Sequence, residues 1–279
     1  MSNLTITTAD GFKLGATQYG KDGDSIIVIN SATAVKQRYY EKFARYLADL
    51  GLTVITYDYR GIGQSRPASS LAGFQATMTE WGILDAEAVI NFARSSYPHR
   101  RLCVIGHSFG GQCLGMLPSH QAIDRVVLVA SQLAYWGNFH KRTWPQMIFY
   151  WYLLFPVVTR LFGYFPGRLG LGEDLPKGVA LQWAKWCRSR DYLFCEANKL
   201  FQTYYENFSA PILAYKISDD SYAGGDSVER LLARYPQSVK RLIELHPADV
   251  GAKSIGHFGL FRETFRDSIW SQIHAWLIS

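Results

Sequence analysis

The sequence has little cysteine and no long hydrophobic run. Its four cysteines form no Cys-x-x-Cys pair and have no histidine cluster beside them, which argues against a metal site or a disulfide scaffold. Four free thiols are typical of a reducing cytoplasm, where we expect the protein to be. The longest apolar run, residues 147–158, is shorter than the roughly 20 residues of a transmembrane helix, so we expect no membrane span.

Two kinds of basic segment are also missing. Residues 1–15 have neither the basic nor the apolar region of a secretory signal, so we expect none. The net charge is +6, but the basic clusters at residues 99–101 and 140–142 are short, and we expect no nucleic-acid partner. A hydrophobic content of 48% with 19% charged residues excludes a disordered chain.

Strand-like and helix-like segments alternate along most of the chain. This alternation predicts an α/β fold, with a mostly parallel sheet flanked by helices. Residues 4–7 and 12–19 predict an antiparallel hairpin at the sheet edge. The other predicted strands are residues 26–30, 53–57, 102–106, 125–130, 211–217 and 239–245. The predicted helices are residues 40–50, 81–92, 109–117 and 261–277.

The alternation stops in residues 132–206, which hold 19 of the 41 aromatic residues and a net charge of +4. We expect a helical, aromatic-rich cap there, inserted into a core formed by residues 1–131 and 207–279. Its aromatic side chains would pack the cap onto the core and line an apolar substrate pocket. The run at residues 147–158 has a second interpretation, as contact with a membrane surface or a partner chain.

The strongest chemical signal is GHSFGG at residues 106–111, a G-x-S-x-G sequence between a predicted strand and a predicted helix. In that context the serine sits on a sharp strand-to-helix turn, with its hydroxyl at the carboxyl edge of the sheet. Gly106 and Gly110 allow neighbouring backbone to come close. Ser108 is therefore the candidate nucleophile, and the backbone N–H of Phe109 is a candidate oxyanion donor.

A second motif, DYRGIGQS at residues 58–65, follows the second core strand. Together with the serine turn it resembles the α/β-hydrolase superfamily, over essentially the whole chain outside the insertion. The resemblance implies the α/β-hydrolase fold and a catalytic triad in the chain order serine, acid, histidine. We interpret Asp58, Arg60 and Ser65 as structural, with Asp58 and Arg60 holding the loop by a charge-assisted bond.

The implied order serine, acid, histidine leaves the last three histidines of the chain: His246, His257 and His274. His257 lies in SIGHFG, a glycine-bracketed loop before the last helix, where relatives carry their catalytic histidine. We therefore favour His257 as the base over His246, which closes a strand before a proline. His107 adjoins Ser108, and we expect it to pack near the site rather than to act as the base.

The acid is expected after the strand at residues 211–217, where Asp219 and Asp220 stand. In relatives the acid is usually the fourth residue of a G-x-x-D turn, and this maps onto Asp220, although Ile217 occupies the glycine position. Asp219 stays open as the alternative. Relatives often have His-Gly after the first core strand, which this chain lacks. The corresponding second oxyanion donor is the N–H of Ala32, with Thr33 next.

The resemblance implies a serine hydrolase that acts on a carboxylic ester or thioester of a small, apolar acyl substrate through an acyl-enzyme. Ser108, His257 and Asp220 would be the triad, and no metal or organic cofactor is implied. Cleavage of a lactone, peptide, amide or C–C bond, and cofactor-free peroxidation, stay open. So do a ligand-binding relative without turnover, a scaffold that binds partners through the cap, and a homo-oligomer.

Overall fold

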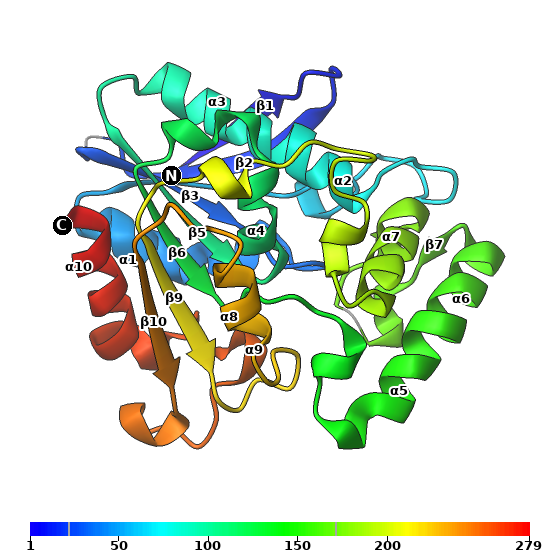
Figure 1. The fold of residues 1–279 in the computed structure, drawn as a ribbon. Coiled ribbons are helices and arrows are strands. Elements are labelled where there is room, and N and C mark those ends of the chain that lie inside the picture. The colour runs from blue at the N-terminus through cyan, green and yellow to red at the C-terminus, as the bar shows by residue number, and fades with distance from the viewer. Residues whose placement is uncertain (22, 171) are drawn as a thin grey trace.

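The computed structural model describes residues 1–279 except Asp22 and Leu171. Its centre is a twisted eight-stranded sheet (Figure 1). In order across the sheet, the strands are β1 (Ser2–Thr7), β2 (Lys13–Tyr19), β4 (Thr53–Tyr57), β3 (Ser25–Asn30), β5 (Arg101–His107), β6 (Arg125–Val129), β9 (Ile212–Ile217) and β10 (Lys240–Leu245).

The pairing confirms the predicted fold class. β1 pairs antiparallel with β2, and β2 pairs antiparallel with β4, which places the hairpin at the edge of the sheet. Every pair from β4 to β10 is parallel. The carboxyl ends of β3 and β5 lie side by side, with Asn30 opposite Gly106. Loops that follow these two strands therefore meet at one edge of the sheet, where ligands bind in open α/β sheets.

Helices cover both faces of the sheet because its central strands are apolar on both faces. Ile26 and Val28 of β3 pack in the same cluster as α3 (Glu87–Ser96). Ile27 and Ile29 point the other way, into the cluster formed by α1 (Glu41–Asp49) and α10 (Ser271–Ile278). The remaining helices of this part are α2 (Met78–Glu80), α4 (Phe109–Gln112), α8 (Ser227–Leu232) and α9 (Gly256–Gly259).

Besides the helix expected over residues 81–92, which begins with a π turn at Trp81–Ala86, two predicted helices differ from those in the structure. The helix expected over residues 109–117 has only α4 as regular helix, because the chain tightens into a 3-10 turn at Cys113–Met116 and Pro118 follows. The helix expected over residues 261–277 begins later, with a π turn at Arg266–Trp270 that leads into α10. Both differences lie at helix ends, where apolar periodicity continues through turns of other types.

Residues 132–206, called the insert below, run between β6 and β9 and are mostly helical. Its helices are α5 (Trp144–Phe149), α6 (Phe155–Phe162) and α7 (Lys177–Arg188), and its short strands are β7 (Tyr164–Phe165) and β8 (Leu175–Pro176). A π turn at Tyr150–Leu154 joins α5 to α6. Figure 1 shows α5 and α6 at the outer edge of the molecule, with α7 beside them. Over the residues that the structure describes, no helix has the length and apolarity to cross a bilayer.

Candidate active site

Ser108 sits on the sharp turn between β5 and α4. Its backbone has φ 52° and ψ −117°, a strained conformation of the kind that clusters at functional sites. The close backbone approach expected at the flanking glycines is present. A Cβ atom on Gly106 would lie 2.4 Å from the Cα of Gly111, and one on Gly110 would lie 2.2 Å from the backbone oxygen of Asn30. Only glycine fits at these positions without backbone movement.

His257 and Asp220, which are far apart along the chain, are in direct contact. Nδ1 of His257 lies 2.7 Å from Oδ2 of Asp220, and both side chains are buried. The other carboxylate oxygen, Oδ1, accepts a hydrogen bond of 2.7 Å from the backbone N–H of Tyr222. This geometry makes Asp220 an acceptor for the Nδ1–H of His257 and leaves Nε2 of the imidazole for another partner.

Asp219 contacts the backbone before His257 instead of its imidazole. Its two carboxylate oxygens accept hydrogen bonds of 2.9 Å from the N–H groups of Ile255 and Gly256. The two neighbouring aspartates therefore hold one loop at two points. Of the other histidines considered, His246 is exposed in the turn after β10 and hydrogen-bonds to Asp249 through its backbone.

Ser108 and His257 line the same cavity, which has a volume of about 550 Å³. The core contributes the loop after β3, the turn with Ser108 after β5, and the loops that carry Tyr222 and His257, and the insert contributes aromatic side chains. Those from the insert are Phe139, Trp151, Trp183 and Tyr192. Lys36 and Glu173 form an ion pair of 2.8 Å at the cavity wall and join the core to the insert there.

The N–H of Ala32, the candidate second oxyanion donor, already has a hydrogen-bond partner within the protein. It donates a hydrogen bond of 2.9 Å to the hydroxyl of Tyr40, and Ala32 is buried. The same hydroxyl lies 2.8 Å from Nδ1 of His107. An oxyanion at Ala32 would have to compete with Tyr40 for this N–H. Thr33, the next residue, is half-buried and also lines the cavity.

His107 is completely buried beside the candidate triad. Its Nε2 lies 2.9 Å from the backbone carbonyl oxygen of His257, and a carbonyl only accepts, so Nε2 carries the proton. Nδ1 then accepts the hydrogen bond from the hydroxyl of Tyr40. Burial, with a smaller contribution from the charge of His257, lowers the pKa of His107 well below its ordinary value of 6.5. His107 is therefore a neutral link between the loop after β3 and the loop that carries His257.

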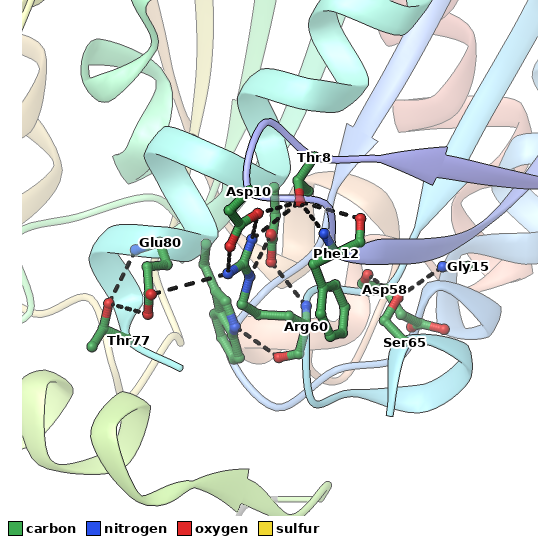
Figure 2. A network of polar contacts seen from close by, with 11 residues as sticks. Thr8, Asp10, Phe12, Gly15, Asp58, Arg60, Ser65, Thr77 and Glu80 are labelled. Carbon is green, nitrogen blue, oxygen red and sulfur yellow. Dashed lines mark hydrogen bonds and ion pairs between the residues drawn. The ribbon is translucent and has the colours of Figure 1, made fainter. Parts of the chain in front are cut away.

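Figure 2 shows the loop at residues 58–65, which the sequence predicts to be structural. Arg60 is buried, and it forms ion pairs of 2.7 Å with Asp85, which is also buried, and with Asp10 on the turn between β1 and β2. Glu80 lies further from the guanidinium, at 4.0 Å. The arginine thus ties the loop to the edge hairpin and to the helical segment that follows α2.

Asp58 and Arg60 do not hold each other, so the predicted bond between them is wrong. Asp58 instead accepts hydrogen bonds from the backbone N–H groups of Gln37 and Gln64, at 2.7 and 2.9 Å. Ser65 donates to the backbone oxygen of Asp58 and accepts from the N–H of Gly15 (Figure 2). Each side chain therefore fixes a different part of the loop.

Two residues around the site were not expected from the sequence. The spacing of Tyr40 in the apolar pattern of residues 40–50 predicts only that its ring is buried. The hydrogen bonds of its hydroxyl could not be predicted from that spacing. Tyr222 follows the candidate acid Asp220 by two residues, and its ring lies 5.2 Å from that of His257. In the part of the chain that the structure describes, no group of three or more His, Cys, Asp or Glu side chains is placed to hold a metal ion.

Several solved structures share this fold at low identity. An esterase from Exiguobacterium antarcticum matches with a TM-score of 0.63 and 16% identity, covering 100% of both chains. A thermophilic esterase from Thermogutta terrifontis matches with a TM-score of 0.61 and 15% identity, covering 100% of this chain and 98% of that one. A bromoperoxidase from Bacillus anthracis matches with a TM-score of 0.62 and 17% identity, covering 100% of both chains.

The search of curated proteins found no match. A family model described as alpha/beta hydrolase fold matches residues 24–164, which is half of the chain. The matched range includes β3 to β6, the loop at residues 58–65 and the turn that carries Ser108. The eight-stranded sheet and the strand-to-helix turn agree with that match, and the chain belongs to the α/β-hydrolase fold family.

Proposed function

We propose that the protein is a serine hydrolase that cleaves a carboxylic ester, or a related acyl bond such as a thioester, through an acyl-enzyme. One observation carries the proposal. His257, which is hydrogen-bonded to Asp220, and Ser108 on its strained turn line a single cavity, although they are far apart along the chain. A nucleophile, a base and a group that orients the base are the parts that acyl transfer requires.

In the proposed mechanism, the hydroxyl oxygen of Ser108 attacks the substrate carbonyl and its proton passes to Nε2 of His257. Asp220 keeps the imidazole in the tautomer with the proton on Nδ1, and it stabilises the imidazolium that forms. His257 then gives the proton to the departing alcohol or thiol, which leaves the acyl group on Ser108. A water molecule, deprotonated by His257, attacks the acyl carbonyl and releases the acid.

The tetrahedral intermediate carries a negative oxygen that needs donors. We assign the first donor to the N–H of Phe109, the first residue of α4, where the helix dipole also favours negative charge. The second donor comes from the loop after β3. Ala32 supplies it if the hydroxyl of Tyr40 releases this N–H, and Thr33 supplies it otherwise.

The insert supports an apolar substrate. Its aromatic residues line the same cavity as Ser108, so the insert would act as a cap over Ser108. An acyl group of medium size fits a cavity of about 550 Å³. The esterases of similar fold agree with this proposal, although their low identity does not transfer a substrate.

A fluorophosphonate probe with intact-mass readout tests the proposal. Wild-type protein should gain one adduct, Ser108→Ala should gain none, and His257→Ala should react at least about 100-fold more slowly because the serine loses its base. Asp220→Asn should also slow labelling. Ser65→Ala serves as the matched control, since this buried serine lies in the structural loop and should leave the adduct unchanged.

Two results would overturn the proposal. One is a folded wild-type protein that gains no adduct, which would favour a ligand-binding relative without turnover. The other is an adduct that persists in Ser108→Ala, which would place the reactive group elsewhere. After a positive result, a panel of p-nitrophenyl esters graded by acyl length would define the chain that the cavity accepts.

A further inference from the structure

The segment formed by α5, the π turn and α6 (residues 144–162) is apolar on two opposite faces. Its inner face packs on the rest of the insert and on the core, and the buried residues there are Met147, Trp151, Phe155 and Val158. A surface helix normally keeps its second face polar. Here the second face is apolar as well, so packing within the chain buries only one of the two apolar faces of the segment.

The outer face, as we call it, is formed by seven exposed apolar residues. Phe149, Leu153, Val157 and Leu161 recur at every fourth position, the spacing that places helical side chains in one row. Leu153 is 53% exposed and Leu161 is 75% exposed. The complete set is Ile148, Phe149, Tyr152, Leu153, Val157, Leu161 and Phe162. Contiguous apolar surface of this kind marks an interaction site rather than scattered exposure.

Cations flank the helical segment in the sequence, and residues 144–162 contain no Asp or Glu. Residues 141–172 contain four Lys or Arg residues and no Asp or Glu. Lys141 and Arg142 precede α5, and Arg160 and Arg168 lie at and beyond the end of α6. Arg188 of α7 adds a fifth cation, with its guanidinium 5.3 Å from the ring centre of Tyr152.

The nearest carboxylates along the chain are already paired away from this face. Glu173 forms an ion pair with Lys36, and Asp174 forms one with Arg66. The surface around the outer face therefore has positive charge at both ends of the helical segment and no nearby negative charge in sequence to offset it.

We propose that the outer face docks on an anionic lipid surface, with the helical segment lying along the bilayer. The apolar side chains would enter the boundary between headgroups and acyl chains, and the cations would contact lipid phosphates. A second copy of this chain fits less well. In a twofold pair of these segments, the cations of one copy would meet those of the other without a counter-charge. This inference does not depend on the acyl chemistry proposed above.

Vesicle co-sedimentation tests the proposal, with vesicles of equimolar phosphatidylcholine and phosphatidylglycerol beside vesicles of phosphatidylcholine alone. Wild-type protein should bind the anionic vesicles, and binding should weaken as salt rises. Leu153→Ser/Leu161→Ser should weaken it at least about tenfold, because two exposed leucines no longer enter the bilayer. Lys141→Gln/Arg142→Gln should weaken it roughly 25-fold, about fivefold for each cation removed.

Matched controls remove equal groups elsewhere on the surface. Leu200→Ser/Val239→Ser changes two apolar residues that are 65% and 74% exposed, and Arg241→Gln/Lys253→Gln changes two exposed cations. Both controls should bind as wild type. The proposal is wrong if wild-type protein binds neither vesicle, or if the controls lose as much binding as the test variants. A dimer that Leu153→Ser/Leu161→Ser dissociates in sedimentation velocity would assign the face to a second copy instead.

Discussion

His107 donates a hydrogen bond of 2.9 Å through Nε2 to the backbone carbonyl of His257. The residue that adjoins the candidate nucleophile therefore holds the backbone of the candidate base. Through the hydroxyl of Tyr40, the same imidazole also reaches the N–H of Ala32. Three loops that surround one cavity thus share a chain of hydrogen bonds, and this chain requires a neutral imidazole at its centre.

Replacing His107 by Gln should change how stability depends on pH. The folded protein keeps His107 neutral, with a lowered pKa, whereas the unfolded chain protonates it near pH 6.5. Its contribution to stability is therefore fully present above pH 6.5 and declines as pH falls below that value. His107→Gln should be less stable than wild type at pH 8, by about 1–3 kcal/mol, and this difference should shrink at pH 5.

Urea denaturation at a series of pH values measures this effect. His246→Gln is the control, because His246 is exposed and its replacement should leave the profile parallel to that of wild type. A stability difference between wild type and His107→Gln that stays constant from pH 8 to pH 5 would show that His107 is not kept neutral by the fold.

Tyr40→Phe should destabilise the protein by about 1–3 kcal/mol, because it leaves the N–H of Ala32 and Nδ1 of His107 buried without their partner. Tyr215→Phe is the matched control. The hydroxyl of Tyr215 is buried and has no hydrogen-bond partner among the described residues, so its removal should be neutral or stabilising. Thermal denaturation of both variants makes the comparison, and equal losses would contradict the role given to Tyr40.

Gly110→Ala should disrupt the turn that carries Ser108. The added methyl group would lie 2.2 Å from the backbone oxygen of Asn30, and backbone cannot rotate away as a side chain can. We expect a loss of about 1–3 kcal/mol or more in the free energy of unfolding. Gly259→Ala, whose methyl group would have its nearest neighbour at 3.4 Å, is the control. Similar denaturation midpoints for the two variants would argue against the close packing described at β3.

Arg60→Met should destabilise the protein by about 3–5 kcal/mol, because it leaves the buried carboxylate of Asp85 without its counter-charge. Burial already raises the pKa of Asp85 to about 7 with Arg60 present. Adding Asp85→Asn to Arg60→Met should restore part of the loss, since a neutral amide needs no cation. If the double variant is no more stable than Arg60→Met in chemical denaturation, lost packing of the arginine explains the effect instead.

The sheet was predictable because local patterns determine it. Apolar runs such as residues 26–30 can be buried on both faces only in a central strand, and β3 occupies that run. The close backbone contacts at the turn were predictable for the same reason, because the glycines that allow them lie within the six residues around Ser108.

The hydrogen bonds around the site were not predictable in the same way. Tyr40 and His107 are 67 residues apart, and the helical spacing of Tyr40 describes only the burial of its ring. The sequence also suggested that Asp58 and Arg60 hold the loop by a charge-assisted bond to each other. In the fold Arg60 reaches Asp10 and Asp85 instead, contacts that depend on where the hairpin and the helical segment after α2 come to rest.

The insert leaves the sheet after β6 and returns at β9, and these two strands are direct neighbours. Because these strands are parallel, the insert leaves at the carboxyl end of β6 and the chain enters β9 at its amino end, where the N–H of Val126 donates to the backbone oxygen of Pro211. Both ends of the insert are therefore fixed by strands of the sheet. A segment tethered in this way can lengthen, shorten or exchange its helices without shifting the register of any strand. The residues that line this side of the cavity can thus change while the sheet and the turn that carries Ser108 keep their positions.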